Sequence, residues 1–391
     1  MFRMKKIWGM ILLTAVLCIG GCGDSSSKKG DSGDVQEERS VTVEQESSAA
    51  EKENNAGSVI SQSAVASLTE SSVVPAVPES LLQEPLESEK ILSEPEQQLF
   101  TEIDHYYIDP VVNSFLSDAG RKVYPSLIDG ILHRQKEIRL TDDYDTNLAL
   151  MMAAKYTPYY FLVKKDTFSS DHRSIRLTYV YDAEQHEEII EFIDQEYLSI
   201  LNSCIRPEMN DVEKTLAVYG YFASRISYDY AWLDELNMSD DKYLFPDIEV
   251  YDALKSNKGV CHSYTYLCQF ALEQLEIECI RVDGLMKEDP DIGHMWLLVK
   301  LDGKFYHCDP TWDSHGDGTA GLEYFGMTDA QREESGIDMN TVMVDTAYGE
   351  VTADSIRFDD LHDVTAFTMK KDHRMEVQRY GETQIIRSDE L

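Results

Sequence analysis

Residues 294–309 read HMWLLVKLDGKFYHCD, and this stretch decides the fold of the central part of the chain. Two runs of aliphatic and aromatic residues flank Asp302-Gly303. Asp-Gly between such runs is typical of a two-residue type I′ turn that joins antiparallel strands. The sequence therefore predicts a hairpin in which Leu301 lies opposite Lys304.

The hairpin register brings an imidazole and a carboxylate to one face of the sheet. It places Trp296 opposite Asp309, and residues that lie opposite one another share a face, as do alternate residues along one strand. His294 therefore lies on the face of Asp309, in the diagonal position at about 7–8 Å between backbones. The two side chains can close this gap. Cys308 points to the opposite face.

A cysteine, Cys261, begins a predicted helix. Apolar side chains recur after it at the spacings of three and four that describe one helix face: Tyr264, Leu267, Cys268, Ala271, Leu272 and Leu275. A thiol in the first turn feels the positive end of the helix dipole and unpaired N–H groups, which favour the nucleophilic thiolate. Gly259 lets the backbone approach closely or bend before the helix.

Cys261, His294 and Asp309 are the residue types that nucleophilic acyl chemistry requires. A thiol attacks a carbonyl, an imidazole takes its proton and later protonates the leaving group, and a carboxylate holds the ring in one tautomer. A nucleophile on a helix with its partners on a sheet indicates a papain-like arrangement. The alternative for Cys261 is a buried structural cysteine.

Three motifs in this region resemble the core pattern of the transglutaminase-like superfamily: G-x-C at 259–261, H-x-W at 294–296 and D-P-T-W at 309–312. Residues 227–230, Ser-Tyr-Asp-Tyr after a predicted helix, also resemble the family's approach to its active-site helix. The motifs lie within residues 210–325, so the resemblance covers only this part of the chain.

The resemblance implies an α+β, papain-like fold with the nucleophile at a helix N-terminus packed on an antiparallel sheet. It implies that Cys261 is the nucleophile, His294 the general base and acid, and Asp309 the orienting carboxylate. His262-Ser263 follow the cysteine, where many relatives carry a small or acidic residue and then glycine. The resemblance therefore does not define which residues line the substrate groove.

Three residues are candidates for the substrate groove or for oxyanion stabilisation: Tyr228, Trp296 and His262. Core packing is the alternative for the tyrosine and the tryptophan. His262 is also a candidate for a rival base, but its neighbour position on the helix points it about 100° away from Cys261. His307 shares the face of His294, either as a hydrogen-bond donor behind the triad or as a packed strand residue.

No metal site and no cofactor are expected. Cys261, His262, His294, His307 and Cys308 are zinc-ligand types, but the pleat points Cys308 away from His294. The cysteine spacings also contain no C-x-x-C pair. Five cysteines follow residue 22, and an odd number leaves at least one thiol unpaired in an exported chain.

The first residues resemble a bacterial lipoprotein signal peptide. Basic side chains precede an apolar run at 7–19, which is too short to span a bilayer permanently. Residues 19–22, Ile-Gly-Gly-Cys, resemble a lipobox, which implies cleavage before Cys22 and a diacylglycerol on its thiol. Residues 1–22 thus predict a protein anchored by lipid at the extracytoplasmic face of the cell membrane. The alternative is an ordinary secretory signal with a chance cysteine.

Residues 23–95 are expected to form a disordered, acidic and Ser-rich tether. No aromatic residue occurs between Trp8 and Phe100, and so little apolar surface cannot offset the entropy of ordering. The formal net charge of −37 opposes nucleic-acid binding, which needs clustered Lys and Arg. The expected partners are a protein or peptide substrate and the membrane, reached through lipid on Cys22.

The rest of the chain is predicted to fold in three parts: an N-terminal helical and αβ region at 96–205, a catalytic core at 206–326 and a C-terminal extension at 327–391. Periodicity and turn residues predict helices at 99–134, 144–156, 184–204 and 211–226, strands at 159–164, 174–181 and 277–285, and short strands within 341–348 and 356–368.

The sequence thus predicts an extracytoplasmic thiol acyl-transfer enzyme that acts on protein or peptide amides. Water as acceptor makes it a peptidase or deamidase, and an amine makes it a transglutaminase; the residues leave this open, and an exposed groove slightly favours hydrolysis. One alternative is a non-catalytic surface-anchored binding or scaffold lipoprotein with a vestigial triad. Another is a different cysteine hydrolase, such as a cell-wall peptidase.

Overall fold

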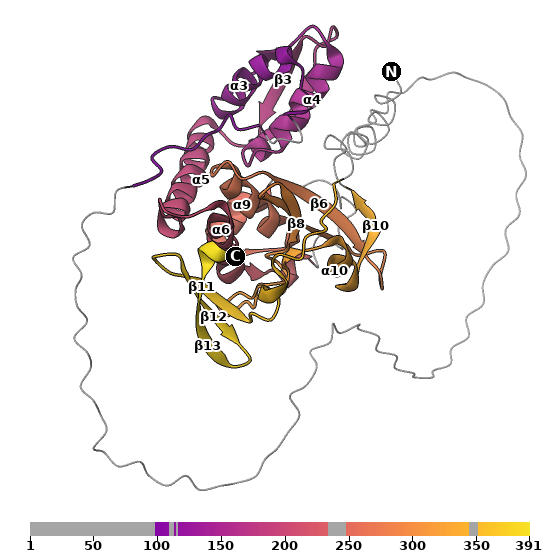
Figure 1. Cartoon of the computed structure of the whole chain (residues 1–391). Helices are drawn as coiled ribbons and strands as arrows, with labels where there is room; N and C mark the ends of the chain where they lie inside the picture. The colour runs from indigo at the N-terminus through magenta and orange to yellow at the C-terminus, as the bar shows by residue number, and fades with distance from the viewer. Residues whose placement is uncertain (1–97, 109–112, 115, 234–247, 344–350) are drawn as a thin grey trace, which may run out of the picture. The chain divides into compact units, whose positions relative to one another are not determined.

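The computed structural model describes residues 98–108, 113–114, 116–233, 248–343 and 351–391 (Figure 1). The predicted signal peptide, Cys22 and the tether lie outside the described residues. Within the described ranges, no helix combines the length and the apolar character that crossing a bilayer requires. Helices and antiparallel sheets are both present, which confirms the α+β class.

A five-stranded antiparallel sheet forms the centre of the fold. Its strand order is β10-β6-β7-β8-β9, and the strands are β6 (Cys279–Met286), β7 (Gly293–Leu301), β8 (Lys304–Cys308), β9 (Phe325–Met327) and β10 (Ile337–Met343). The β7–β8 register pairs Leu301 with Lys304, as predicted. Asp302 and Gly303 both have positive φ, at 49° and 78°, which confirms the type I′ turn.

The two faces of this sheet carry different side chains, in agreement with the predicted alternation. Leu297 and Cys308 belong to the main hydrophobic core, together with residues of the helices. Trp296 and Leu298 pack instead with Ile280 and neighbours from β6 and β10, in a separate buried cluster. Cys308 therefore points away from the Trp296 face.

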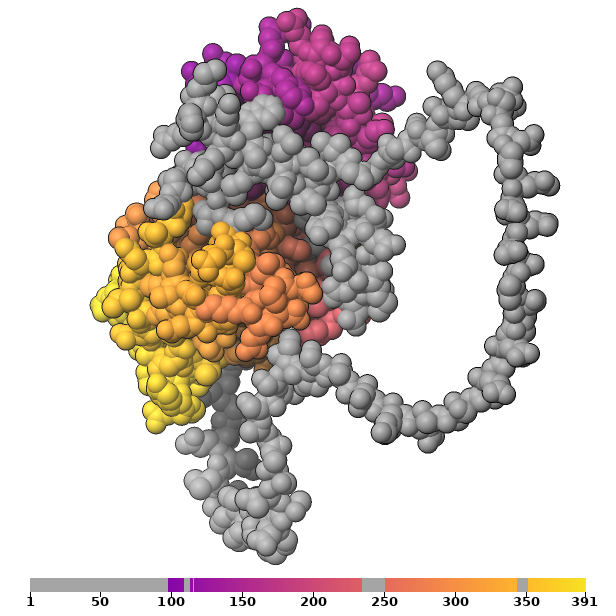
Figure 2. Space-filling view, turned by 90° about the vertical axis from the view of Figure 1, so that its right-hand side faces the viewer, coloured from indigo at the N-terminus to yellow at the C-terminus, as the bar shows by residue number. Residues whose placement is uncertain are grey.

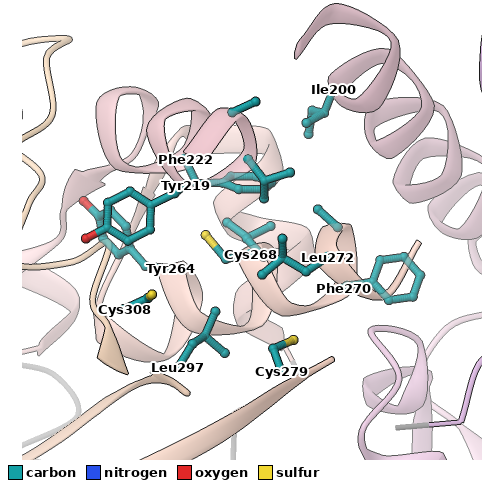
Figure 3. Packing of buried hydrophobic residues seen from close by; sticks show 14 of the residues in the cluster. Ile200, Tyr219, Phe222, Tyr264, Cys268, Phe270, Leu272, Cys279, Leu297 and Cys308 are labelled. Atoms are coloured by element: carbon teal, nitrogen blue, oxygen red, sulfur yellow. The ribbon is translucent and has the colours of Figure 1, made fainter. Parts of the chain in front are cut away.

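Helix α9 (Cys261–Glu273) lies at the centre of the main core (Figure 3). It contacts the sheet through β6 and β7, and it also contacts α6 (Asp211–Arg225) and α8 (Ile248–Ser256). The sequence predicted that one apolar face of this helix is buried. The buried surface is wider than predicted, because polar positions such as Thr265 and Gln269 are buried as well. Only His262 and Tyr266 of this helix remain partly exposed.

Helix α5 (Ala183–Cys204) and helix α6 match their predicted positions. Asn210 and Glu213 form a capping box that fixes the start of α6. After α6, the chain pairs β4 (Ser227–Tyr228) in parallel with β5 (Lys258–Gly259). This short pair brings the end of α6 beside the residues that lead into α9.

The N-terminal elements have a small core of their own. They comprise α3 (Asp118–Leu132), α4 (Tyr144–Lys155) and a sheet of order β1-β3-β2, formed by β1 (Glu137–Arg139), β2 (Val163–Phe168) and β3 (Ser174–Tyr179). The helix predicted from residue 99 was too long, since its cap is Ser117. The strand predicted at 159–164 begins only at Val163, because Tyr160–Leu162 form a 3-10 turn.

The last part of the chain contributes to the core rather than trailing from it. Helix α10 (Asp329–Glu334) precedes β10, and β9 spans the boundary expected between residues 326 and 327. A third sheet of order β11-β12-β13 follows, formed by β11 (Ala366–Met369), β12 (Arg374–Arg379) and β13 (Glu382–Arg387). In the space-filling view the yellow C-terminal residues adjoin the orange residues that precede them (Figure 2), and β11 contacts α6. Phe358, Met375 and Val377 belong to the main hydrophobic core.

Candidate active site

Cys261 is the first residue of α9, as the sequence predicted. Val260 caps the helix in an extended conformation, and its N–H donates to the Ser263 hydroxyl at 3.2 Å. The Cys261 residue is only 7% exposed. Its position places the thiol at the positive end of the helix, where a thiolate is favoured.

Gly259 is required by the way in which the chain enters this helix. A Cβ atom at position 259 would lie 2.3 Å from both Cβ and Oγ of Ser263. The Asp229 N–H donates to the Gly259 carbonyl at 2.9 Å, so the glycine backbone is also held from the β4 side. The close approach predicted for Gly259 is confirmed.

The first turn of α9 is joined to the strand that carries His294. The Thr265 hydroxyl lies 2.9 Å from the Cys261 carbonyl oxygen and 3.2 Å from that of Met295. Its single proton is shared between these two acceptors, one on each element. Thr265 is fully buried, so no water competes for this contact.

His294 and Asp309 form the pair that the hairpin register predicted. The His294 Nε2 lies 2.6 Å from the Asp309 Oδ2, and both side chains are buried. The other carboxylate oxygen, Oδ1, accepts from the N–H groups of Thr311 and Trp312 at 3.1 and 3.3 Å. Since a carboxylate only accepts, Nε2 carries the proton in the neutral ring, and Nδ1 keeps a lone pair for an incoming proton.

A third group contacts Asp309, and the sequence reasoning missed it. Arg332 of α10 is fully buried, and its Nη2 donates to the same Oδ2 at 2.6 Å. Its guanidinium carbon lies 4.4 Å from the ring centre of Trp296 and 4.1 Å from that of Trp312. No local signal marks Arg332, since α10 is a six-residue polar helix.

These contacts set the charge of Asp309. Burial alone would raise the pKa of this carboxyl group, but the positive charges of His294 and Arg332 and their hydrogen bonds outweigh burial and lower the pKa to about 2. Asp309 is therefore ionised throughout the neutral range. Such a carboxylate can orient His294 and stabilise its protonated form.

Asp313, four residues after Asp309, is in the opposite protonation state. Burial, with a contribution from the nearby Asp309 charge, raises its pKa to about 8. The Tyr219 hydroxyl and the Tyr324 N–H, the latter at 3.0 Å, both donate to its Oδ2. Asp313 directly follows the D-P-T-W motif, and it is a buried carboxylic acid beside the triad.

The structure corrects the prediction for Trp296. Its side chain is fully buried, so it does not line a substrate groove. Its Nε1–H donates to the His307 Nδ1 at 2.8 Å, and the His307 Nε2 therefore carries the proton that reaches Asp329 Oδ1 at 2.8 Å. Burial lowers the pKa of His307, which agrees with a neutral ring. His307 is a packed strand residue that fixes Trp296.

Tyr228 and His262 are both partly exposed. Burial raises the pKa of the Tyr228 hydroxyl, and the nearby Cys261 thiol adds to this rise. In the β4–β5 register Tyr228 pairs with Gly259, two residues before Cys261. The Tyr230 ring stands 4.9 Å from the Tyr228 ring, at 53°, and is largely exposed. A groove or oxyanion role for Tyr228 and His262 remains a prediction.

None of the cysteines within the described ranges forms a disulfide. Burial raises the pKa of Cys204 and Cys308 to about 12, and it raises the pKa of Cys268 well above its ordinary value. These three thiols stay protonated at neutral pH. In the same part of the chain, no three His, Cys, Asp or Glu side chains gather as a metal site.

A scan of known protein families gives one match. Residues 199–310 match the family described as "Transglutaminase-like superfamily". The chain carries a transglutaminase-like domain. The matched range contains Cys261, His294 and Asp309, and it ends before α10, so Arg332 lies outside it. The resemblance inferred from the motifs is therefore confirmed for this domain.

Two solved structures are similar to part of the chain. "Crystal structure of a TGase" is 18% identical, with a TM-score of 0.26, and the match covers 38% of this chain and 44% of that one. A protein described as "a Putative Cysteine Protease from Cytophaga hutchinsonii" is 14% identical, with a TM-score of 0.23, over 38% and 61%. The matches thus span less than two thirds of either protein. No curated protein matched the chain.

Proposed function

We propose that the transglutaminase-like domain catalyses thiol acyl transfer from protein or peptide amides, with Cys261, His294 and Asp309 as the catalytic triad. The observation that supports this most strongly is the buried 2.6 Å contact between His294 and Asp309. It leaves the imidazole Nδ1 as a base, on the strand that Thr265 ties to the first turn after Cys261.

The proposed reaction has two halves. His294 Nδ1 takes the thiol proton, the Cys261 sulfur attacks the amide carbonyl, and the Cys261 N–H stabilises part of the oxyanion. The C–N bond then breaks, the amine or ammonia leaves with the proton from His294, and a thioester remains. Water attacks that thioester to give a carboxylic acid, or an amine attacks it to give a new amide, and the thiol is restored.

The first experiment detects the thioester by intact-protein mass after exposure to an amide library. The wild type should gain the mass of an acyl group, and Cys261→Ala should gain none. His294→Ala should acylate at least about 10²-fold more slowly, because general-base catalysis contributes that much. Cys204→Ala is the matched control, since the raised pKa of the Cys204 thiol keeps it protonated at neutral pH, and it should behave as wild type. Equal acylation of wild type and Cys261→Ala, or none in any folded sample, contradicts the proposal.

A second experiment separates the two acceptors. A fluorescent primary amine is added to the acylating mixture, and the fates of the thioester are counted by mass. Free acid as the main product supports a peptidase or deamidase. Amine incorporation as the main product would make the protein a transglutaminase.

We also propose that lipid on Cys22 holds this domain at the extracytoplasmic face of the cell membrane. The support is the apolar run at 7–19 followed by Ile-Gly-Gly-Cys. In a bacterial host, the full chain should partition into detergent and carry the mass of a diacylglycerol. Cys22→Ser should partition into water. Identical partitioning of the two proteins would refute the anchor.

A further inference from the structure

We infer that Arg332 is a positioning residue for the triad, so that the segment after the matched family range completes the active site. The inference rests on the proposed function, because it assigns Arg332 a role in the reactivity of Cys261. Arg332 belongs to α10, whereas the family match ends at residue 310. Neither the motifs nor the match assigns it a role.

The first argument is the position of the guanidinium. Arg332 Nη2 and His294 Nε2 contact the same oxygen of Asp309, each at 2.6 Å. The N–H groups of Thr311 and Trp312 hold the other oxygen. Arg332 is the only one of these four donors that comes from outside the hairpin and its following turn, so it fixes the carboxylate from the side of α10.

The second argument is that Arg332 also contacts the aromatic ring on which His294 stacks. The His294 ring stacks on the Trp312 ring, with centres 4.6 Å apart and planes 15° apart. The guanidinium lies 4.1 Å from the centre of that same ring and 4.4 Å from Trp296. Arg332 thus contacts both groups that orient the imidazole: the carboxylate on its Nε2 and the indole on its face.

The third argument is energetic. Arg332 is fully buried, and its Nε and Nη1 have no hydrogen-bond partner. Burying a charge is costly, and replacing a buried ion pair by apolar side chains of similar volume is often neutral or stabilising. Folding alone therefore gives little reason for an arginine at this position, whereas the orientation of His294 gives a direct one.

The test measures the reactivity of Cys261, so that it does not depend on an unknown substrate. The rate of alkylation of Cys261 by iodoacetamide at neutral pH is followed by intact mass and peptide mapping in the full-length protein. Arg332→Lys keeps the charge but loses the planar stack, and Arg332→Gln keeps an N–H donor without charge. Alkylation should be about tenfold slower in Arg332→Gln and less slowed in Arg332→Lys.

The matched control is Arg281→Lys. The Arg281 guanidinium is also sandwiched between two rings, 3.9 Å from Tyr156 and 4.0 Å from Tyr266, but these are not the rings that stack on His294, which are Trp296 and Trp312. In this variant, Cys261 should be alkylated at the wild-type rate. Thermal unfolding of every variant identifies samples that are not folded. Two different substitutions at Arg332 are used so that the test can proceed with either variant that folds.

The outcomes are distinguishable from those of the proposed function. Wild-type alkylation rates in both folded Arg332 variants, or equal slowing in Arg281→Lys, would overturn the inference. If the wild type alkylates readily but never forms a thioester with amides, the proposed function fails while Arg332 is still judged by the alkylation rates.

Discussion

Thr265 donates its buried hydroxyl to the carbonyl oxygen of Met295 at 3.2 Å, and this contact links the helix of Cys261 to the strand of His294. The same hydroxyl lies 2.9 Å from the Cys261 carbonyl oxygen, so it acts at the first turn of α9. Thr265 therefore connects the backbone of Cys261 to the strand that carries His294.

Replacement of Thr265 by valine should lower the reaction rates of Cys261 without unfolding the protein. Valine keeps the shape but removes the hydroxyl, at a cost of about 1 kcal/mol in stability. A small shift between nucleophile and base should lower the alkylation rate of Cys261, and any amide acylation, about tenfold. Thr265→Ser keeps the donor and should stay close to wild type. Equal rates in Thr265→Val and wild type would show that the link is not needed.

Gly259→Ala should destabilise the start of α9. The new Cβ would lie 2.3 Å from Ser263 Cβ, and overpacking of this kind costs about 1–3 kcal/mol. The free energy of unfolding is measured in urea. Since the clash is with the Ser263 side chain, the double variant Gly259→Ala/Ser263→Gly should be less destabilised than the sum of the two single variants. Strict additivity would mean that the close contact is not the cause.

The hairpin and the His294–Asp309 pair could be predicted from the sequence because one short turn fixes every later position. Asp302-Gly303 sets the register, and alternation then assigns each side chain to a face. The same reasoning put Trp296 on the correct face but did not show how deeply its side chain is buried. Depth depends on what covers the face, and here Ile337 of β10 and Arg332 of α10 cover it.

Arg332 could not be predicted, because its role depends on tertiary contacts alone. It lies in a short helix of polar residues, where an arginine ordinarily faces solvent. The surroundings of α9 were also beyond the local pattern, since Thr265 and Gln269 interrupt its apolar positions and are nevertheless buried. Periodicity indicates an apolar stripe, but it does not reveal that other elements cover most of the helix surface.

Asp313 should make stability fall as the pH rises. Its pKa is about 8 in the folded state, against an ordinary value of 3.8, so between these values the unfolded chain loses the proton while the folded chain keeps it. The stabilisation is therefore complete below about pH 4 and is lost as the pH rises to about 8. Asp313→Asn cannot ionise, so its stability relative to wild type should rise from pH 5 to pH 8.5.

Urea unfolding at pH 5, 7 and 8.5 checks this prediction. Asp171→Asn, at an exposed loop position, is the control, and it should show the pH dependence of wild type. The Asp313→Asn variant keeps an amide oxygen for the Tyr219 hydroxyl and the Tyr324 N–H, so the fold should tolerate it. If the stability difference does not change with pH, Asp313 is not protonated in the folded state.

Asp309→Asn should have the opposite pH dependence. The Asp309 pKa of about 2 lies below its ordinary 3.8, so its contribution to stability is present above about pH 4 and is lost as the pH falls through about 2. At neutral pH the variant should lose about 3–5 kcal/mol, because it leaves the buried Arg332 without its countercharge. The deficit should shrink towards pH 2, where wild-type Asp309 is itself becoming neutral. A deficit that stays constant between pH 7 and pH 2 would show that packing at this position, and not the charge shared by His294 and Arg332, stabilises the site.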